Sequence, residues 1–309
     1  MEAWLLTNEV AVRLFFFFGV LGIVALWEFF APQRQRQRSV LFRWFNNLGL
    51  VFLNSAVLRW LFPMAAVAFA SVATERGWGL LNLLDPHPAF AFLVSVLLLD
   101  LAIYLQHVLF HAVPAFWRLH RVHHADVDYD VTTGARFHTI EIILSMGIKF
   151  AVIAVLGPQA VAVLVFEILL NATAMFNHGN IYLPKEIDRV LRLVVVTPDM
   201  HRVHHSVLPD ECNCNFGFNL PWWDRLMGTY REAPINGQRG MIIGLSRFRN
   251  PNNIWLHRML MIPFRPESGG YAINRRWDDV FPEGDGKKRS EGSEEGDETE
   301  GAGNAETSE

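Results

Sequence analysis

Residues 89–124 read AFAFLVSVLLLDLAIYLQHVLFHAVPAFWRLHRVHH, and this stretch decides the fold that the sequence predicts. It is apolar through Leu99 and then turns polar at Asp100, Gln106, His107 and His111. A bilayer-spanning helix needs about 20 mainly apolar residues. We therefore predict a membrane span over Ala89 to His111 whose polar end carries two histidines one helical turn apart.

Two further histidine clusters share one pattern. His120-Arg-Val-His123-His124 follows the span directly, and His201-Arg-Val-His204-His205 repeats it 81 positions later. Positions i, i+3 and i+4 share one face of an α-helix, so each cluster directs three imidazoles to one side. Neutral imidazole is the commonest protein metal ligand. The clusters predict a metal site, because random order would produce one such cluster in roughly one sequence in fifty and a pair far more rarely.

Two isolated histidines extend the predicted ligand set. His178 closes a long apolar segment at the level expected for the clusters, so we predict that it is a ligand. His138 precedes the same segment, and it is either a ligand, a partner of a ligand, or a structural helix cap. His87 and His257 stand outside the clusters and are expected to be hydrogen-bonded structural residues. The predicted metal ligands are thus His107, His111, His120, His123, His124, His178, His201, His204 and His205, with His138 as a further candidate.

Acidic residues near the clusters could orient the imidazoles through their second ring nitrogen. Asp100 shares the helix face of His107 and His111, Glu141 follows His138, and Asp199 precedes the last cluster. Asp126, Asp128 and Asp130 are expected to be solvated loop acids.

The number of imidazoles exceeds what one metal ion can use. Two ions with four or five nitrogens each fit the count and leave a position for dioxygen or water. Zinc hydrolysis is disfavoured, because no HExxH motif supplies a glutamate base. Soluble di-iron bundles use carboxylates, and this sequence has histidines instead.

The rest of the chain predicts an all-α, multi-pass bundle of about four to five spans. Val10 to Ala31 is the first span, rather than a cleaved signal peptide, because acidic residues precede it and arginines follow. Ile140 to Met175 is broken at Gly157-Pro158 and predicts a helical hairpin. Leu41 to Ala73 is interrupted by polar residues and Pro63. It is either an interfacial helix followed by a span, or one kinked helix whose Arg59 faces other protein. The short apolar segments 184–197 and 254–264 are expected to be interfacial or core helices.

Orientation follows from the arginine cluster at 34–43, which the positive-inside rule keeps in the cytoplasm. Residues 1–9 then lie outside, and every clustered histidine reaches the cytoplasmic face. We expect residues 10–265 to form the membrane domain with a cytosolic helical cap. Arginine outnumbers lysine 23 to 4, which suggests a bacterial origin and hence the inner membrane.

Composition agrees with a membrane protein, since 51% of residues are hydrophobic and only 19% are charged. Soluble domains carry about 25% charge. The remaining segment, 266–309, is predicted to be a C-terminal extension. From about residue 283 it holds ten acidic and three basic residues and should be disordered. The two cysteines, Cys212 and Cys214, are expected to be ordinary reduced thiols. Nothing indicates a nucleic-acid partner.

The pattern resembles the fatty acid hydroxylase/sterol desaturase superfamily. The resemblance covers roughly residues 10–235 and is carried by the order of the histidine clusters and by several strings. These are Trp117-Arg118-Leu119-His120, Arg136-Phe137-His138, Thr197-Pro198-Asp199-Met200-His201-Arg202, Asn215-Phe216-Gly217 and Trp223-Asp224-Arg225-Leu226-Met227-Gly228-Thr229-Tyr230. The spacing from His107 to His124 particularly resembles alkylglycerol monooxygenases.

The resemblance implies a membrane-bound non-haem di-iron oxygenase with two iron ions held by histidines alone. It implies dioxygen-dependent hydroxylation of an alkyl C–H bond in a lipid, such as a fatty acid, sterol or ether lipid. Asn215 and Asp224 lie in the matching strings and become further candidates for partners of the ligands. No haem domain fits before residue 10 or in the acidic tail, so a separate electron-transfer protein or a reduced pterin is expected as donor.

Two other functions remain open at this stage. A lipid or sterol desaturase would use the same scaffold, because a ligand list does not separate hydroxylation from desaturation. A non-catalytic metal-binding or transport protein is the alternative from another class, although a transporter should place its ligands near mid-membrane. The sequence leaves the substrate, the electron donor, the metal in vivo and the oligomeric state undetermined.

Overall fold

The computed structural model describes residues 1–266 and 270–273. These residues form helices and connecting loops with no β-strand among them, which confirms the predicted all-α class. The expected C-terminal extension, with its acidic tail from about residue 283, lies almost entirely outside the described residues. The first element, α1 (Glu2–Thr7), leads directly into the long helix α2 (Glu9–Phe30).

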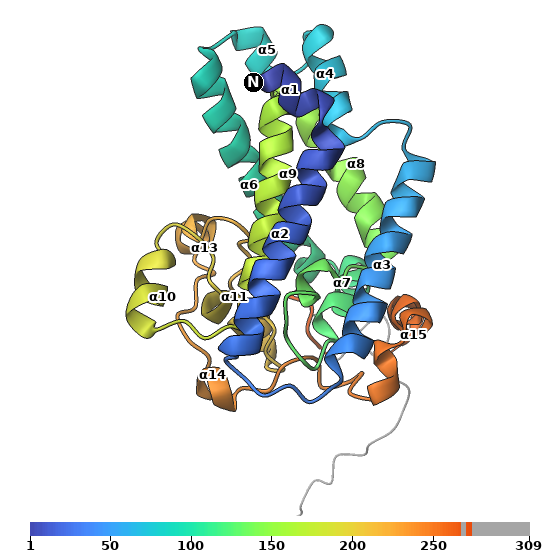
Figure 1. Ribbon diagram of the computed structural model, residues 1–309, viewed down its shortest axis with the longest axis vertical. Coiled ribbons are helices and arrows are strands. Elements are labelled where there is room, and N and C mark those ends of the chain that lie inside the picture. The colour runs from blue at the N-terminus through green and yellow to red at the C-terminus, as the bar shows by residue number, and fades with distance from the viewer. Residues whose placement is uncertain (267–269, 274–309) are drawn as a thin grey trace, which may run out of the picture.

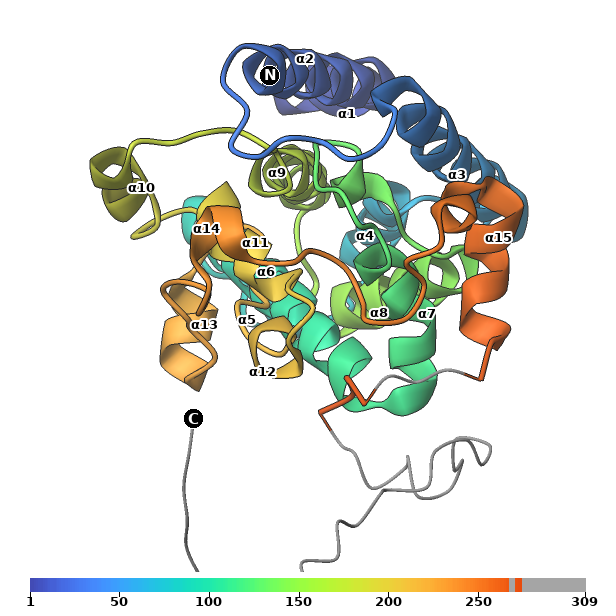
Figure 2. The same ribbon diagram turned by 90° about the horizontal axis from the view of Figure 1, so that it is seen from below.

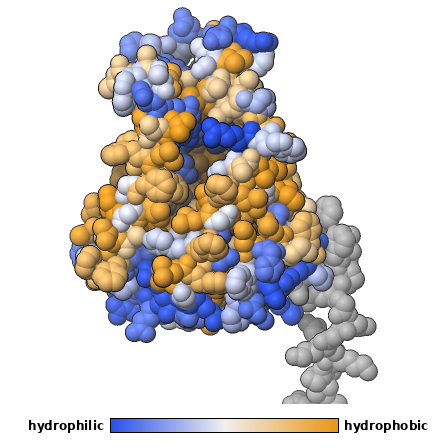
Figure 3. Space-filling view, turned by 45° about the vertical axis from the view of Figure 1, so that its right-hand side comes forward, coloured by the Kyte–Doolittle hydropathy of each residue, from blue (hydrophilic) through white to orange (hydrophobic). Residues whose placement is uncertain are grey.

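Five described segments are long and apolar enough to cross a membrane, and this count confirms the predicted four to five spans. They are α2, the region Val40–Leu84, α6 (Pro88–Ala112), α8 (Thr139–Leu156) and α9 (Ala160–Asn177). Large apolar side chains point outward from these helices; Phe15 and Phe29, for example, are 73% and 74% exposed. They form the hydrophobic band around the middle of the molecule in Figure 3, which is where lipid tails would lie.

The predicted hairpin is formed by α8 and α9. Gly157 ends α8 in the left-handed conformation with φ of +68°, which glycine adopts without strain. A Cβ atom at this position would lie 2.4 Å from the carbonyl oxygen of Trp78. The turn therefore requires glycine both for its backbone angle and for the close approach of the segment that contains Trp78.

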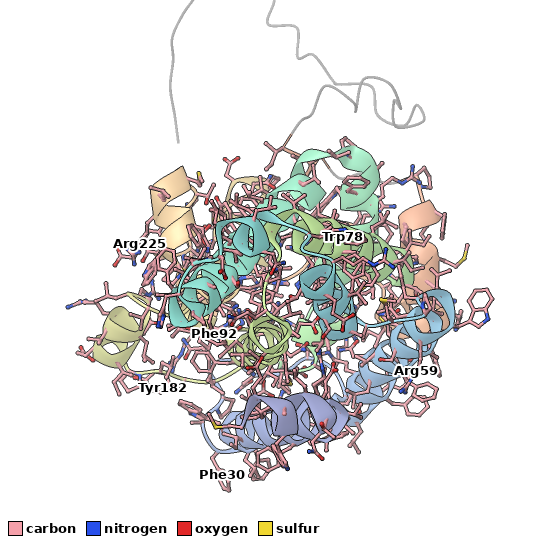
Figure 4. The ribbon with its side chains drawn as sticks, turned by 90° about the horizontal axis from the view of Figure 1, so that it is seen from above. Phe30, Arg59, Trp78, Phe92, Tyr182 and Arg225 are labelled. Carbon is pink, nitrogen blue, oxygen red and sulfur yellow. The ribbon has the colours of Figure 1, made fainter. Side chains whose placement is uncertain are left out.

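The ambiguous region 41–73 forms two separate helices, α3 (Val40–Leu61) and α4 (Ala66–Glu75), followed by the short α5 (Leu80–Leu84). The break falls around Pro63, which cannot continue a helix. Arg59 is exposed on the outer side of α3, and Figure 4 shows it at the edge of the bundle. The alternative in which Arg59 faces other protein is therefore wrong. An arginine near a helix end can extend its long side chain toward the membrane surface, and burial in protein is not needed.

The bundle is centred on α9, which packs against α2, α4 and α6. Seen from below, α9 lies inside the ring that the other helices form (Figure 2). On α4, Ala66, Ala70 and Ala73 are 1%, 0% and 0% exposed. Small side chains allow close contact between helices in a membrane, where packing rather than the hydrophobic effect drives association.

A cap of short helices covers the end of the bundle opposite the N-terminus (Figure 1). It comprises α7 (Pro114–His124), η1 (Thr133–Ala135), α10 (Lys185–Leu191), α11 (Pro198–His204), α12 (Pro209–Cys212), α13 (Trp222–Met227), α14 (Gly237–Gly240), η2 (Pro251–Ile254), α15 (Leu256–Met261) and η3 (Ile262–Phe264). The last turn of α6 and the end of α9 reach this cap. Every histidine cluster therefore lies at one end of the molecule.

Buried ion pairs fasten the loop after α7 to α3. Arg43 binds Asp126 through Nη2 at 2.6 Å and also binds Asp130, and all three side chains are 0% exposed. Asp128 accepts hydrogen bonds from the backbone N–H groups of Gln37 and Arg38 at 2.9 and 2.8 Å. The expectation of solvated loop acids is wrong, because these carboxylates satisfy a buried guanidinium and two backbone donors.

Candidate metal centre

The structure brings the nine predicted histidines of the main set together in two adjacent groups. The five-histidine set consists of His107, His111, His120, His124 and His204, and the four-histidine set consists of His123, His178, His201 and His205. All nine are buried. Within each set, one nitrogen from every ring lies within 4.8 Å of the others.

The five-histidine set joins α6, α7 and α11. The Nε2 atoms of His107 and His120 are 3.0 Å apart, and those of His111 and His124 are 3.2 Å apart. The i, i+4 spacing on α6 places His107 and His111 on one face, as the sequence predicts. His204 completes the set from α11, and its Nε2 has no hydrogen-bond partner within the described chain.

The four-histidine set joins α7, the end of α9 and α11. His178 Nε2 lies 3.1 Å from His123 Nε2 and 3.2 Å from His205 Nε2. His178 follows α9 directly, so the hairpin carries it to the level of α7 and α11. Each HRVHH cluster therefore supplies histidines to both sets, and consecutive residues such as His123 and His124 belong to different sets.

The second ring nitrogen of several histidines is held by an acceptor. His107 Nδ1 lies 2.7 Å from the carbonyl oxygen of Phe216, and His204 Nδ1 lies 2.7 Å from that of Cys214. The carbonyl of Ala174 is 2.7 Å from His178 Nδ1. These acceptors require Nδ1 to carry the proton, so Nε2 presents a lone pair to the centre of each set.

This arrangement fits bound metal cations. Two Nε2 lone pairs that face each other at about 3 Å cannot hydrogen-bond to each other, and a cation between them satisfies both. Burial lowers the pKa of His120 and of His178 to about 3, so both rings are neutral at physiological pH. Burial also lowers the pKa of His123, His124 and His205 well below the ordinary value. All-nitrogen sets of four and five neutral imidazoles suit iron, copper, zinc or nickel.

The remaining histidines lie outside both sets. His138 is the N-cap of α8: its Nδ1 accepts a hydrogen bond from the backbone N–H of Ile140, and its Nε2 lies 3.3 Å from the Leu260 carbonyl oxygen. His87 caps α6 in the same way, and His257 is exposed. Of the three alternatives predicted for His138, the structure shows the helix cap.

The predicted carboxylate partners have different positions. Glu141 contacts one of the clustered histidines directly: its Oε1 lies 2.7 Å from His120 Nδ1, and the residue is 4% exposed. Asp100 instead accepts hydrogen bonds from Trp223 Nε1 at 2.8 Å and from the backbone of Leu220. Asp199 pairs with Arg202. Of these three acids, Glu141 alone reaches an imidazole.

Asp224 and Asn215 hold the backbone that contacts the ligands. Asp224 accepts hydrogen bonds from the N–H groups of Phe216 and Gly217 at 2.8 and 2.9 Å. It thereby fixes the loop whose Phe216 carbonyl meets His107. Asn215 donates to the Met200 carbonyl at 2.8 Å and adopts a positive φ of 51°. Both residues position the centre through this loop.

Sequence reasoning missed the acceptors that belong to the backbone and to Asn213. Asn213 Oδ1 lies 3.0 Å from His111 Nδ1. The carbonyl groups of Ala174, Cys214 and Phe216 leave no signal in the sequence, because every residue has a carbonyl. Cys212 and Cys214 are free and buried, and Cys212 Sγ lies 3.6 Å from His124 Nδ1.

A cavity of 430 Å³ opens above the five-histidine set, between α2, α3, α6, α8 and α9. His107, His120 and Phe218 line its lower end, and its walls combine apolar side chains with polar ones such as Gln106, Ser145 and Asn171. The hollow lies within the hydrophobic band in Figure 3. A molecule in this cavity would contact the bundle interior along its length and the metal centre at one end.

Fold and site together define an integral membrane protein with two histidine sets that could hold metal ions at one end of a helical bundle. Residues 92–229 match the sequence profile of the fatty acid hydroxylase family. This match confirms the resemblance of the segment to the hydroxylase/desaturase superfamily. The segment contains all nine clustered histidines, Glu141 and the loop that Asp224 holds.

Curated relatives come from the same superfamily. The chain is 26% identical over 228 residues to the ornithine lipid hydroxylase OlsE of Rhizobium tropici, covering 71% of this chain and 66% of the relative. It is 28% identical over 177 residues to alkylglycerol monooxygenase of Danio rerio, covering 57% and 37%. It is 26% identical over 178 residues to human cholesterol 25-hydroxylase, covering 55% and 64%.

The chain spans less than two thirds of the length of each of these relatives. Their names describe hydroxylases and monooxygenases, which are oxidoreductases, the enzyme class that the sequence predicts. No solved structure matches the chain significantly.

Proposed function

We propose that this protein is a membrane-bound non-haem oxygenase that uses two iron ions and dioxygen to hydroxylate an alkyl C–H bond of a lipid. One observation carries the proposal: two all-histidine sets stand side by side, and His107 and His120 of the five-histidine set line a cavity inside a membrane bundle. The names of the relatives, all lipid or sterol hydroxylases and monooxygenases, support it.

The five-histidine set and the four-histidine set would each hold one ion. Bound iron would supply the activation of dioxygen, which protein side chains cannot perform. The protein's own residues do the rest. Glu141 and the three carbonyl groups hold the rings in the tautomer that directs Nε2 inward. His107 and His120 also line the cavity floor, so a substrate that fills the cavity lies next to the five-histidine set.

The cavity wall excludes water from the reacting end. Phe110, Phe137 and Phe218 line it near His107 and His120. His123 stacks on Phe137 with ring centroids 4.5 Å apart. Water exclusion matters, because a strong oxidant formed in contact with water would be quenched instead of attacking a C–H bond.

Desaturation on the same scaffold is the second candidate, since the ligands and cavity would serve it equally. A metal transporter is disfavoured, because both sets lie at helix ends in a closed cap and not at the middle of the spans. Electrons would come from a separate protein or a reduced pterin. The arginine-rich segment 34–43 lies at the same end as the histidines, which supports the proposed cytoplasmic side. A bacterial inner-membrane location is part of the same proposal.

Lipid extracts of cells with and without the gene, grown under ¹⁸O₂, test the proposal. We expect a lipid that carries one added ¹⁸O atom and that disappears when the gene carries His204→Ala. A desaturase would instead yield a product two hydrogens lighter without the label. The complete absence of a gene-dependent lipid change would contradict both oxidative functions.

A further inference from the structure

The cavity has a charged end opposite the histidines. Arg13 of α2, Lys149 of α8 and Glu167 of α9 line it there. Glu167 accepts hydrogen bonds from both cations, and Arg13 also binds Glu9 at 2.9 Å. Charged side chains within a span are costly and commonly mark a functional site. Lys149 and Glu167 lie well inside α8 and α9, so this cluster requires an explanation.

Helix pairing alone explains only part of the cluster. Both oxygens of Glu167 are engaged, and its side chain is 8% exposed. Arg13 and Lys149 keep more donors than Glu167 can use: within the described residues, Arg13 Nη1 and two N–H groups of Lys149 have no partner. Their side chains remain 27% and 16% exposed, and both residues line the cavity. Unused donors facing a cavity suit a ligand that offers an oxygen acceptor.

The separation of the two ends follows from helix geometry. Lys149 lies eight residues beyond Glu141 on α8, and Glu167 lies eleven residues before His178 at the end of α9. At about 1.5 Å per residue, the charged end is roughly 12–16 Å from the histidines. An extended alkyl chain rises about 1.3 Å per carbon for C–C bonds of about 1.5 Å, so roughly nine to twelve carbons cover this distance.

A lipid can enter the cavity in two orientations. With its polar end at the histidines, its alkyl chain would meet Arg13 and Lys149 and leave their donors unsatisfied, which is costly. With its polar end at the cations, the chain lies against Phe17, Met146 and Leu170 and ends beside His107. In the second orientation the polar end accepts hydrogen bonds from the cations, and the alkyl chain contacts apolar side chains.

We propose that Arg13 and Lys149 form a subsite for the small, oxygen-bearing polar end of the lipid substrate, a hydroxyl or a carboxylate, and that the oxidised carbon lies roughly nine to twelve carbons away. A bulky ionic headgroup is disfavoured, because it would have to be buried inside the spans. The identity of the reaction in this inference rests on the proposed function. The orientation of the bound lipid, and which of its carbons lies beside the histidines, can be measured without turnover.

Photoaffinity labelling of the full chain in lipid nanodiscs tests the register without catalysis. The probes are dodecanoic acid and dodecanol, each carrying a diazirine at carbon 3 or carbon 10, and dodecane with the same groups as the chain without a polar end. Carbon 10 should label Phe110, Phe137 or Phe218, and carbon 3 should label Phe17 or Met146. The reversed pattern, or equal labelling by dodecane, would overturn the subsite. The two polar probes show whether the acid or the alcohol binds more tightly.

Variants separate binding from helix pairing. Lys149→Met combined with Glu167→Gln removes donors without leaving an unpaired carboxylate, and should reduce labelling by the polar probes about tenfold. Glu167→Gln alone keeps the donors and should preserve labelling, as should Lys149→Arg. Equal loss in Glu167→Gln would show that the cluster is structural and overturn the proposal. Correct labelling by a protein that yields no ¹⁸O-labelled lipid in cells would refute the proposed function and leave the subsite standing.

Discussion

Glu141→Gln tests how the protein holds its metal ligands. The Glu141 carboxylate is 4% exposed and lies 2.7 Å from His120 Nδ1. Glutamine keeps an oxygen acceptor of nearly the same shape but removes the negative charge. The hydrogen bond thus loses its charge assistance, which makes such bonds roughly twice as strong as neutral ones. We therefore expect the arrangement of the imidazole rings to be preserved while the affinity of the five-histidine set for metal falls.

Loss of such a partner typically lowers metal affinity about 10- to 100-fold, which equals roughly 1.4–2.7 kcal/mol. The assay is metal content of purified full-length protein by mass spectrometry after equilibration with graded chelator. Glu141→Ala should lose more than Glu141→Gln, since it leaves the His120 N–H without an acceptor. Glu167→Gln is the matched control, because Glu167 is similarly buried beside the same cavity but contacts no histidine.

The reasoning is refuted if Glu141→Gln retains metal at the same chelator concentration as the unmodified protein. It is also refuted if Glu167→Gln loses as much metal as Glu141→Gln. The loss would then follow from removing any buried charge in the bundle, and not from the contact with His120.

Three further perturbations have defined outcomes. Arg43→Met should lower the free energy of unfolding by about 3–5 kcal/mol in chemical denaturation, because buried Asp130 loses its cationic partner and buried Asp126 keeps only Arg136. An unchanged midpoint would contradict this. Gly134→Ala places a Cβ 2.4 Å from the Ala174 carbonyl oxygen that holds His178. It should therefore release metal from the four-histidine set with little change in the circular dichroism of the helices. Full retention of metal would contradict the importance of this close contact. In metal-free protein, the pKa of His120 and of His178 is lowered to about 3, so the unfolded chain binds more protons than the folded chain between about pH 3 and 6.5. The contribution of these two residues to stability should therefore be constant above pH 6.5 and fall below it by about 1.4 kcal/mol per pH unit for each residue, and a pH-independent midpoint from pH 7 to 5 would be the contrary result.

The sequence predicted the spans well, because a bilayer demands long apolar helices whose ends turn polar or break. Thus the predicted hairpin over Ile140 to Met175, with its turn at Gly157-Pro158, matches the outer ends of α8 and α9 to within two residues. The region around Pro63 stayed ambiguous, since a proline indicates an interruption but not whether a kink or a new helix follows.

The site was predictable where spacing alone determines direction. The HRVHH clusters point three rings to one side of a helix, but periodicity does not reveal that neighbouring rings divide between two metal sets. His138 and His178 look similar in sequence, as each stands at one end of the hairpin. The structure separates them, because the side chain of His138 caps α8 whereas His178 Nε2 meets two other imidazoles.

The acidic residues show the limit of this reasoning most clearly. Asp100 lies on the helix face of His107, yet it bonds to Trp223, a residue 123 positions away. Asp126 and Asp130 have the sequence signature of a solvated loop, and only the tertiary contact with Arg43 makes them buried. Such partners are fixed by packing between distant segments, which local patterns do not encode.

The central claim is a centre of two metal ions held by two histidine sets, and the metal content of the purified chain tests it most directly. We expect about two ions per chain, with His204→Ala depleting the five-histidine set and His178→Ala depleting the four-histidine set, while His138→Ala retains both ions. A content of one ion or none in the unmodified protein, or full content after His204→Ala, would contradict the account.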